Sequence, residues 1–251
     1  MDSISRFNNR VENYIKFRPG YPPEIIGFLK KEIGLKPSDL VADMGSGTGI
    51  LSELLLKNGN EVYGVEPNKE MHQAAEKLLK GYDNFHSINS KAENTNLDDN
   101  SIDLITAGQS FHWFNNEKTR KEFKRILKPD RFTVLIWNNR SENSSEFMKD
   151  FDQLLNNLES DYKEVKHENL NDNDFQRFFG TKSYSIDSYV NFQSLDYKGL
   201  LGRILSASYA PTEGEAYTKM INEVKEIFTK HNENGRIKIE YKTKIYYGKI
   251  I

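Results

Sequence analysis

Three glycines at alternate positions, Gly45, Gly47 and Gly49, form the stretch whose residue types and spacing most clearly predict chemistry. Glycine has no Cβ, so it accepts positive φ and lets a ligand lie directly against the backbone. The spacing is G-x-G-x-G, not the G-x-G-x-x-G that is typical of a dinucleotide pyrophosphate site. Asp43, just before the first glycine, would accept a hydrogen bond from an ammonium group and repel a phosphate. The motif therefore favours a ligand that carries an amino-acid moiety.

The residues around this loop predict the elements that hold it. An apolar strand beginning at Leu40 precedes the glycines, a helix begins with residues 51–56, and a second strand covers residues 61–66. A helix that starts after such a loop directs unpaired N–H groups at the ligand. The second strand ends in Glu66, and an acidic residue about 20 residues after the first glycine binds ribose hydroxyls in doubly wound folds.

An alternative interpretation is that the glycines only make a tight turn and that Glu66 is a solvated strand end. The order of strand, glycine turn, helix, strand and acidic residue argues against this alternative. The sequence therefore predicts a nucleotide-type site at the first crossover of an α/β sheet.

Two segments, Val41-Ala-Asp-Met-Gly-Ser-Gly-Thr-Gly49 and Val62-Tyr-Gly-Val-Glu-Pro67, resemble motifs I and II of class I S-adenosylmethionine-dependent methyltransferases. Segments 109–114, 136–140 and 205–211 resemble the small-molecule branch that includes trans-aconitate-type methyltransferases. The resemblance implies S-adenosylmethionine as the methyl donor and S-adenosylhomocysteine as the product. The residues expected to bind the donor are Asp43, Gly45, Ser46, Gly47, Thr48, Gly49, Glu66, Pro67, Ala92, Glu93 and Gln109.

Composition limits the other functions that the chain could have. Its 251 residues suit one α/β domain, and 35 Lys and Arg against 37 Asp and Glu give a net charge of −2. This balance favours a small-molecule partner over a nucleic acid. The chain has no cysteine, and its histidines show no metal-ligand spacing, so we expect no disulfide, thiolate nucleophile or metal. We expect no signal peptide or membrane span, and hence a cytoplasmic protein.

The apolar pattern predicts a doubly wound α/β fold, and the family resemblance implies that it is a Rossmann-like fold in a single methyltransferase domain. We expect a mostly parallel seven-stranded sheet whose last strand is antiparallel. Residues 1–36 form an N-terminal arm, 37–138 the cofactor-binding core, 139–181 a small helical cap and 182–251 the C-terminal part of the sheet. We also expect a turn at residues 128–131 and a loop at residues 169–174.

The arm is aromatic and basic, and it includes Tyr14 and Arg18. These two residues are four apart, so they share one face if the segment is helical. The family resemblance implies that the arm covers the cofactor and the substrate, where a mobile lid would exclude water. The alternative is ordinary aromatic packing.

Residues at the ends of two later strands are candidates for contact with the acceptor. His112 and Trp113 follow the fourth strand, at the edge of the sheet where α/β folds bind ligands. His112 could act as a general base, or it could be a packed residue that makes an ordinary hydrogen bond. Arg140 ends the fifth strand and could bind a carboxylate through its planar guanidinium, or it could form a structural salt bridge.

The predicted reaction is methyl transfer to a small acceptor, in which the enzyme mainly aligns the two reactants. A carboxylate acceptor is ionised at neutral pH and needs no base, and Arg18 or Arg140 could orient it. A phenol, amine or carbon acceptor would need a base such as His112 or Tyr14. Two alternatives are a non-catalytic sensor of S-adenosylmethionine and, less favoured by the glycine spacing, a nicotinamide oxidoreductase.

Overall fold

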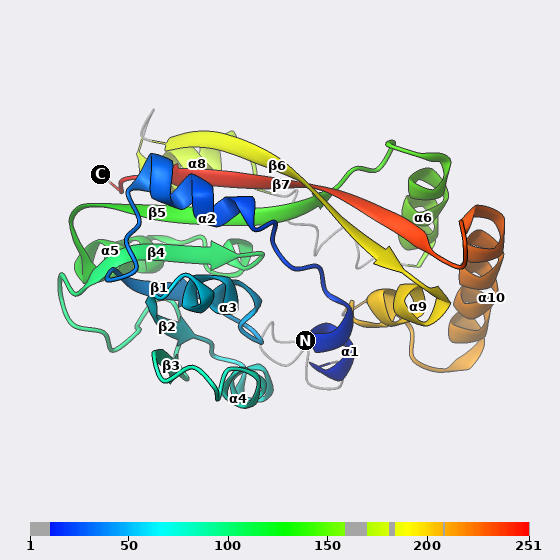
Figure 1. Cartoon of the computed structure of the whole chain (residues 1–251), viewed down its shortest axis with the longest axis horizontal. Coiled ribbons are helices and arrows are strands. Elements are labelled where there is room, and N and C mark those ends of the chain that lie inside the picture. Colours follow the sequence, from blue (N-terminus) through cyan, green and yellow to red (C-terminus); the bar gives the residue numbers. More distant parts are fainter. Residues whose placement is uncertain (1–10, 159–169, 181–183, 208, 251) are drawn as a thin grey trace.

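A seven-stranded sheet with the strand order β3-β2-β1-β4-β5-β7-β6 forms the centre of the molecule (Figure 1). The computed structural model describes residues 11–158, 170–180, 184–207 and 209–250. Residues 1–10 of the predicted arm, residues 159–169 with His167, residues 181–183 and Ser208 of segment 205–211 lie outside this description. The strands are β1 (Leu40–Met44), β2 (Glu61–Val65), β3 (Phe85–Ile88), β4 (Ile102–Gly108), β5 (Leu127–Arg140), β6 (Tyr184–Leu195) and β7 (Ile237–Gly248).

The strand directions confirm the predicted fold class. Strands β1 to β5 pair in parallel, whereas β7 is antiparallel to both β5 and β6. The carboxyl ends of β1, β2 and β4 therefore meet at one edge of the sheet. This edge carries Asp43 and Glu66, and Gln109 follows the end of β4.

Helices cover both faces of the sheet, and adjacent residues of β7 show the two faces clearly. Tyr247 packs edge-on against Phe28 of α2 (Glu24–Phe28), with ring centroids 5.0 Å apart. The next side chain, Tyr246, points to the other face and stacks on Phe175 of α8 (Asp172–Phe179) at 4.1 Å. The first face also packs against α3 (Ile50–Lys57), and the second against α5 (Glu117–Ile126).

A third apolar cluster lies at the far end of the long strands β5, β6 and β7 (Figure 1). It joins α6 (Glu146–Asn157), α9 (Tyr197–Leu205) and α10 (Gly214–His231). The arm helix α1 (Val11–Phe17) packs on α9, where Gly202 leaves room for the ring of Phe17. The remaining helices are η2 (Leu29–Ile33), α4 (Lys69–Leu78) and the short η3 (Phe111–Trp113).

Two local predictions were wrong. Residues 128–131 do not separate a helix from a strand, because β5 already begins at Leu127 and contains a bulge in its pairing with β4. Asp130 takes a positive φ of 63° inside this bulge. The predicted loop 169–174 is also shorter than expected. Residues from Asp172 onward are helical, because Asn171 and Asp174 form a reciprocal capping box at the start of α8.

Within the part of the chain that the structure describes, no helix is long and apolar enough to span a membrane.

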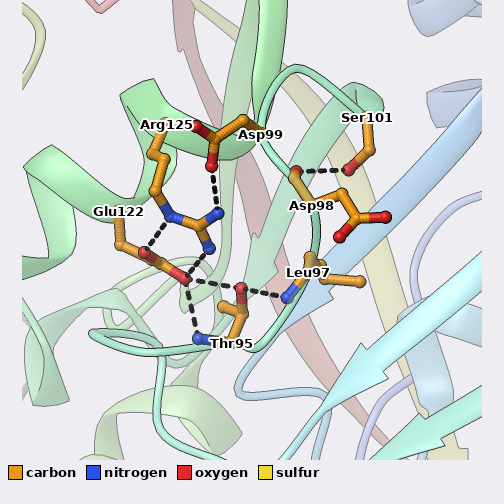
Figure 2. A network of polar contacts seen from close by, with 7 residues as sticks. All are labelled: Thr95, Leu97, Asp98, Asp99, Ser101, Glu122 and Arg125. Carbon is orange, nitrogen blue, oxygen red and sulfur yellow. Dashed lines mark hydrogen bonds and ion pairs between the residues drawn. The ribbon is translucent and has the colours of Figure 1, made fainter.

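A polar network fixes the loop between β3 and β4 against α5 (Figure 2). The Glu122 carboxylate accepts hydrogen bonds from the backbone N–H and the hydroxyl of Thr95, at 2.7 and 2.6 Å. It also accepts two bonds from the guanidinium of Arg125, which in turn binds Asp99. Burial alone would raise the pKa of Glu122, but these hydrogen bonds lower it to about 2.

We expect Glu122→Gln to lower the free energy of unfolding by about 2 kcal/mol at pH 7, because it removes charge-assisted hydrogen bonds to a nearly buried group. The pKa of Glu122 in the folded protein lies below the ordinary value of 4.5. The stabilisation is therefore present above pH 4.5 and is lost as the pH falls toward 2. Urea unfolding of both proteins between pH 3 and 7 measures the difference.

Glu117→Gln is the control, because Glu117 lies on the same helix and forms only a 3.5 Å surface pair with Arg120. Equal stabilities of the Glu122→Gln and Glu117→Gln proteins at pH 7 would contradict the role assigned to the network.

Candidate active site

The glycine loop between β1 and α3 adopts a backbone that requires glycine. Gly45, Gly47 and Gly49 all have positive φ, of 64°, 57° and 86°. A Cβ on Gly45 would also lie 2.6 Å from the Cβ of Ser110. The N–H groups of Gly45 and Ser46 donate to the Val65 carbonyl, at 2.8 and 3.2 Å. The loop is therefore tied directly to the end of β2.

The Asp43 carboxylate is buried beside this loop, with only 1% of the residue exposed. One oxygen accepts a hydrogen bond from the Ser52 hydroxyl at 2.7 Å, and the other accepts one from Thr106 at 3.0 Å. Burial raises the pKa of Asp43 to about 6, although these bonds partly oppose the shift. At pH 7 the group is mostly ionised, so it can still attract a cation.

Glu66 is also fixed from both sides. One carboxylate oxygen accepts the N–H of Gly47 at 2.9 Å, and the other accepts the N–H of Asn68 at 2.8 Å. Burial raises the pKa of Glu66, and the two backbone bonds limit the shift. Because a carboxylate oxygen can accept more than one hydrogen bond, each oxygen retains capacity for a hydroxyl donor.

A small cavity joins the glycine loop to the N-terminal arm, with about 40 Å³ open to the centres of water molecules. The residues that line it are Tyr14, Arg18, Pro19, Tyr21, Asp43, Gly45, Ser46, Thr48, Ile50, Leu51, Gly108 and Gln109. The arm is held over the site at Gly20, whose carbonyl accepts hydrogen bonds from Asn138 and Asn191. The predicted candidates Tyr14 and Arg18 thus line one cavity with five of the predicted donor-binding residues, namely Asp43, Gly45, Ser46, Thr48 and Gln109, whereas Gly47, Gly49 and Glu66 do not line it.

Two atoms at this cavity have unused hydrogen-bonding capacity. The Thr48 hydroxyl and the Nε of Arg18 are buried, and neither has a partner among the described residues. Buried polar groups normally have partners, so these atoms favour a polar ligand. The buried Asp43 carboxylate and the Thr48 hydroxyl lie beside the glycine loop, which suits the ammonium group in the amino-acid moiety of S-adenosylmethionine. The residues present therefore fit this cofactor.

Gln109 takes a positive φ of 59° directly after β4, where its N–H donates to Ile136. Such a backbone is uncommon for a residue with a side chain, and it is often found at functional sites. Its amide Nε2 lies 3.4 Å from the carbonyl of Asn138. Gln109 therefore connects the cavity to the end of β5.

Three predicted acceptor-site residues do not line this cavity. His112 is half buried on η3, and its ring lies 4.6 Å from that of Trp113, which is 38% exposed. Arg140 forms a 3.2 Å ion pair with Asp152 of α6. The structure thus contains the salt bridge that was the alternative interpretation of Arg140.

Three further residues predicted to bind the donor, Pro67, Ala92 and Glu93, come after Glu66 in the sequence. Ala92 is buried in the core, and the carboxylate of Glu93 accepts a hydrogen bond from Asn116 at 3.1 Å. Pro67 is half buried beside Asn68, whose side chain caps α4. None of these three predicted residues lines the cavity.

Sequence reasoning missed three residues that shape the site. Tyr21 lines the cavity, and burial raises the pKa of its hydroxyl well above the ordinary value. Ser52 and Thr106 hold Asp43 from α3 and β4. Ser52 could have been found from its place on the first turn of the helix after the glycines. Thr106 is 63 residues from Asp43, so only the pairing of β1 with β4 brings it near.

Comparisons with known proteins find similarity to methyltransferases. Residues 42–135 match the model of a family described as a methyltransferase domain. An uncharacterised methyltransferase of Schizosaccharomyces pombe is 34% identical over 150 residues, which cover 59% of this chain and 58% of that protein. A provisionally named methyltransferase of Dictyostelium discoideum is 31% identical over 190 residues, 75% of this chain and 65% of its own. The chain therefore matches less than two thirds of the length of either relative.

A solved structure from Anaeromyxobacter dehalogenans, provisionally assigned as a type II methyltransferase, has the same fold. It superposes with a TM-score of 0.69 at 18% identity, over 94% of this chain and 99% of that one. At this identity the likeness is evidence for the fold alone. The chain is therefore similar to methyltransferases in sequence, over residues 42–135 of the family model and in part of the two relatives, and similar in fold to the solved structure.

Proposed function

We propose that the chain transfers the methyl group of S-adenosylmethionine to a small-molecule acceptor that enters under the N-terminal arm. The observation that carries this proposal is the cavity that Asp43, Thr48 and the glycine loop share with Tyr14 and Arg18 of the arm. Residues of the arm close one side of the site, so a compact acceptor fits better than a polymer. The net charge of −2 also gives no support for a nucleic-acid acceptor.

Asp43 and Glu66 have separate roles in this proposal. Asp43 receives the ammonium group of the donor, and Glu66 receives the ribose hydroxyls. Both carboxylates are already held by two hydrogen bonds, so little side-chain freedom is lost on binding. The donor supplies an activated methyl on a sulfonium centre. The chain's own task is to hold the acceptor in line and to exclude water.

The acceptor atom in this proposal is a carboxylate oxygen. Besides Asp43, which is assigned to the ammonium group, the ionisable residues lining the cavity are two tyrosines and Arg18. A buried tyrosine with a raised pKa, such as Tyr21, is a poor base at neutral pH. A carboxylate needs no base, and Arg18 can orient it. His112 and Arg140 then act outside the reaction itself. A non-catalytic sensor remains the second candidate, because the same contacts would hold a bound donor without turnover.

We expect S-adenosylmethionine and S-adenosylhomocysteine to bind in calorimetry, and NAD not to bind. Asp43→Asn and Glu66→Gln should each weaken binding of S-adenosylhomocysteine at least tenfold, about 1.4 kcal/mol, because each removes the charged acceptor of a ligand hydrogen bond. The control is Glu61→Gln, at the opposite end of β2, where Glu61 pairs with His86 on the surface. If Asp43→Asn and Glu66→Gln both bind S-adenosylhomocysteine as tightly as the wild type, the roles assigned to these two carboxylates are wrong.

Binding of the donor should depend on pH through Asp43. Its pKa is about 6 in the protein without ligand, and the ammonium group requires the ionised form. Affinity should therefore fall about tenfold between pH 7.5 and pH 5, where only about one site in ten is ionised. In Asp43→Asn this dependence should disappear. A profile that is identical in the wild type and the variant would show that Asp43 does not contact the ligand's charge.

Turnover of a labelled methyl donor against small acids, phenols and amines separates an enzyme from a sensor. We expect acids to be methylated at rates that vary less than threefold between pH 6.5 and 8.5, because no base has to lose its proton. His112→Asn should change kcat less than threefold. A preference for phenols or amines, together with a large effect of His112→Asn, would contradict the carboxylate assignment.

A further inference from the structure

Two arginines from distant parts of the sequence meet at the arm end of the cavity. Arg18 follows α1, and one of its terminal nitrogens donates to the Ser206 carbonyl at 3.1 Å. Arg203 lies on α9, and one of its terminal nitrogens is 3.5 Å from the Ser206 hydroxyl. Both guanidinium groups therefore reach the same residue, 188 positions from Arg18. Of these two arginines, only Arg18 was a candidate from the sequence.

Among the described residues, no carboxylate forms an ion pair with either guanidinium group. Within the described part of the chain, Arg203 contacts the hydroxyls of Tyr241 and Ser206. The Arg18 guanidinium lies 4.7 Å from the centre of the Tyr14 ring. Burial lowers the pKa of Arg18, and the nearby charge of Arg203 lowers it further. The Nε of Arg18 is buried without a partner, as noted above.

The C-terminal end of α9 offsets the positive charge of the two arginines only in part. The Ser206 carbonyl lies at the C-terminal end of α9, where the helix carries about half a negative charge. Two positive charges exceed that amount. Buried charges are normally paired, and an unpaired buried charge is strongly unfavourable. The pair therefore has the character of an anion site.

The surrounding bonds hold Arg203 in place. Its Nε lies 3.4 Å from the Tyr241 hydroxyl, which donates to Gln193 at 2.8 Å. The amide of Gln193 donates in turn to the Phe17 carbonyl of the arm. A chain of contacts thus runs from Arg203 through β7 and β6 to the residue next to Arg18.

We propose that Arg18 and Arg203 form an anion subsite for an acidic acceptor, in which Arg18 contacts the oxyanion and Arg203 acts as a positioning residue. This inference rests on the proposed function. Arg18 lines the cavity together with Asp43 and Tyr14, so an anion held there lies beside the donor pocket. Arg203 reaches the site through Ser206 and through the packing of α9 on α1.

The carboxylate of the donor itself is the other source of such an anion. Arg203 and Ser206 favour the acceptor, because they belong to α9. This helix packs on the arm, and α1 lies between it and α3 in Figure 1. Glu66 and the glycine loop, which mark the proposed donor position, lie on the α3 side.

The first test uses a plain oxyanion, so that it does not depend on knowing the acceptor. Crystals of the complex with S-adenosylhomocysteine are soaked in sodium selenate, and the anomalous signal of selenium locates the anion. We expect a peak within hydrogen-bond distance of Arg18, and its loss in Arg203→Met. Absence of a peak at Arg18 in the wild type would overturn the proposal. If no complex with S-adenosylhomocysteine forms, crystals of the protein alone are soaked instead, and a selenium peak at Arg18 there would leave the anion subsite standing while the donor assignment fails.

The second test uses three variants to decide whether the bound anion belongs to the acceptor or is the carboxylate of the donor. Arg203→Met removes the charge, Arg203→Lys keeps it, and Arg236→Met removes an exposed arginine as the control. We expect Arg203→Met to raise KM for an acid 10- to 100-fold and to change kcat less than threefold, with partial rescue by lysine. Affinity for S-adenosylhomocysteine should change less than threefold in all variants.

A tenfold loss of that affinity in Arg203→Met would assign the two arginines to the donor. Equal turnover of acids and their primary amides would also overturn the proposal. Melting temperatures show whether each variant is folded.

Discussion

The buried carboxylate of Asp43 is the constraint on which the site depends. A carboxylate with almost no access to water is tolerated only when its oxygens have partners, and here a helix and a neighbouring strand each supply one hydroxyl. These bonds join β1, α3 and β4 at the edge where their ends meet. The raised pKa shows that the two bonds do not fully replace water. A cation at this position would complete the electrostatic balance.

The rest of the molecule is arranged around that edge. Aromatic side chains of α2 and α8 hold the two faces of the sheet, and the Glu122 network holds the loop that leads toward β4. The helices α6, α9 and α10 form their own apolar cluster, on which the arm rests. The arm is therefore attached to the cluster at α9 and to the sheet at Gly20. Both attachments place Tyr14 and Arg18 over the glycine loop.

Local sequence signals were sufficient for most of the fold. Alternation in β7 and the apolar run of β4 reflect burial on one or both faces, so they predict strands without knowledge of their neighbours. The start of α8 was missed although Asn171 and Asp174 have the spacing of a capping box. The bulge in β5 could not be found in this way, because it is defined by pairing with β4.

The residues of the site also divide into those that a local pattern predicts and those that depend on contacts between distant segments. The glycine spacing indicated the loop, Asp43 and Glu66, since those residues lie within one crossover. Thr106, Arg203 and Ser206 were missed because their roles arise from contacts between distant segments. Burial and pairing also distinguish residues that look alike in the sequence. Arg140 has a carboxylate partner, whereas Arg18 has none among the described residues.

The attachment at Gly20 divides the arm into two mechanically different parts. The Gly20 carbonyl accepts hydrogen bonds from β5 and β6 side chains, so the backbone is clamped to the sheet at that residue. Tyr21 lies on the clamped side and stays against Gly108. Tyr14 and Arg18 lie on the other side, which is held by α9 and β6: the Phe17 ring packs at Gly202, and the Phe17 carbonyl accepts a hydrogen bond from Gln193. Any displacement of Tyr14 and Arg18 would therefore have to break contacts with α9 and β6 as well, and it would remove two side chains of the pocket wall together.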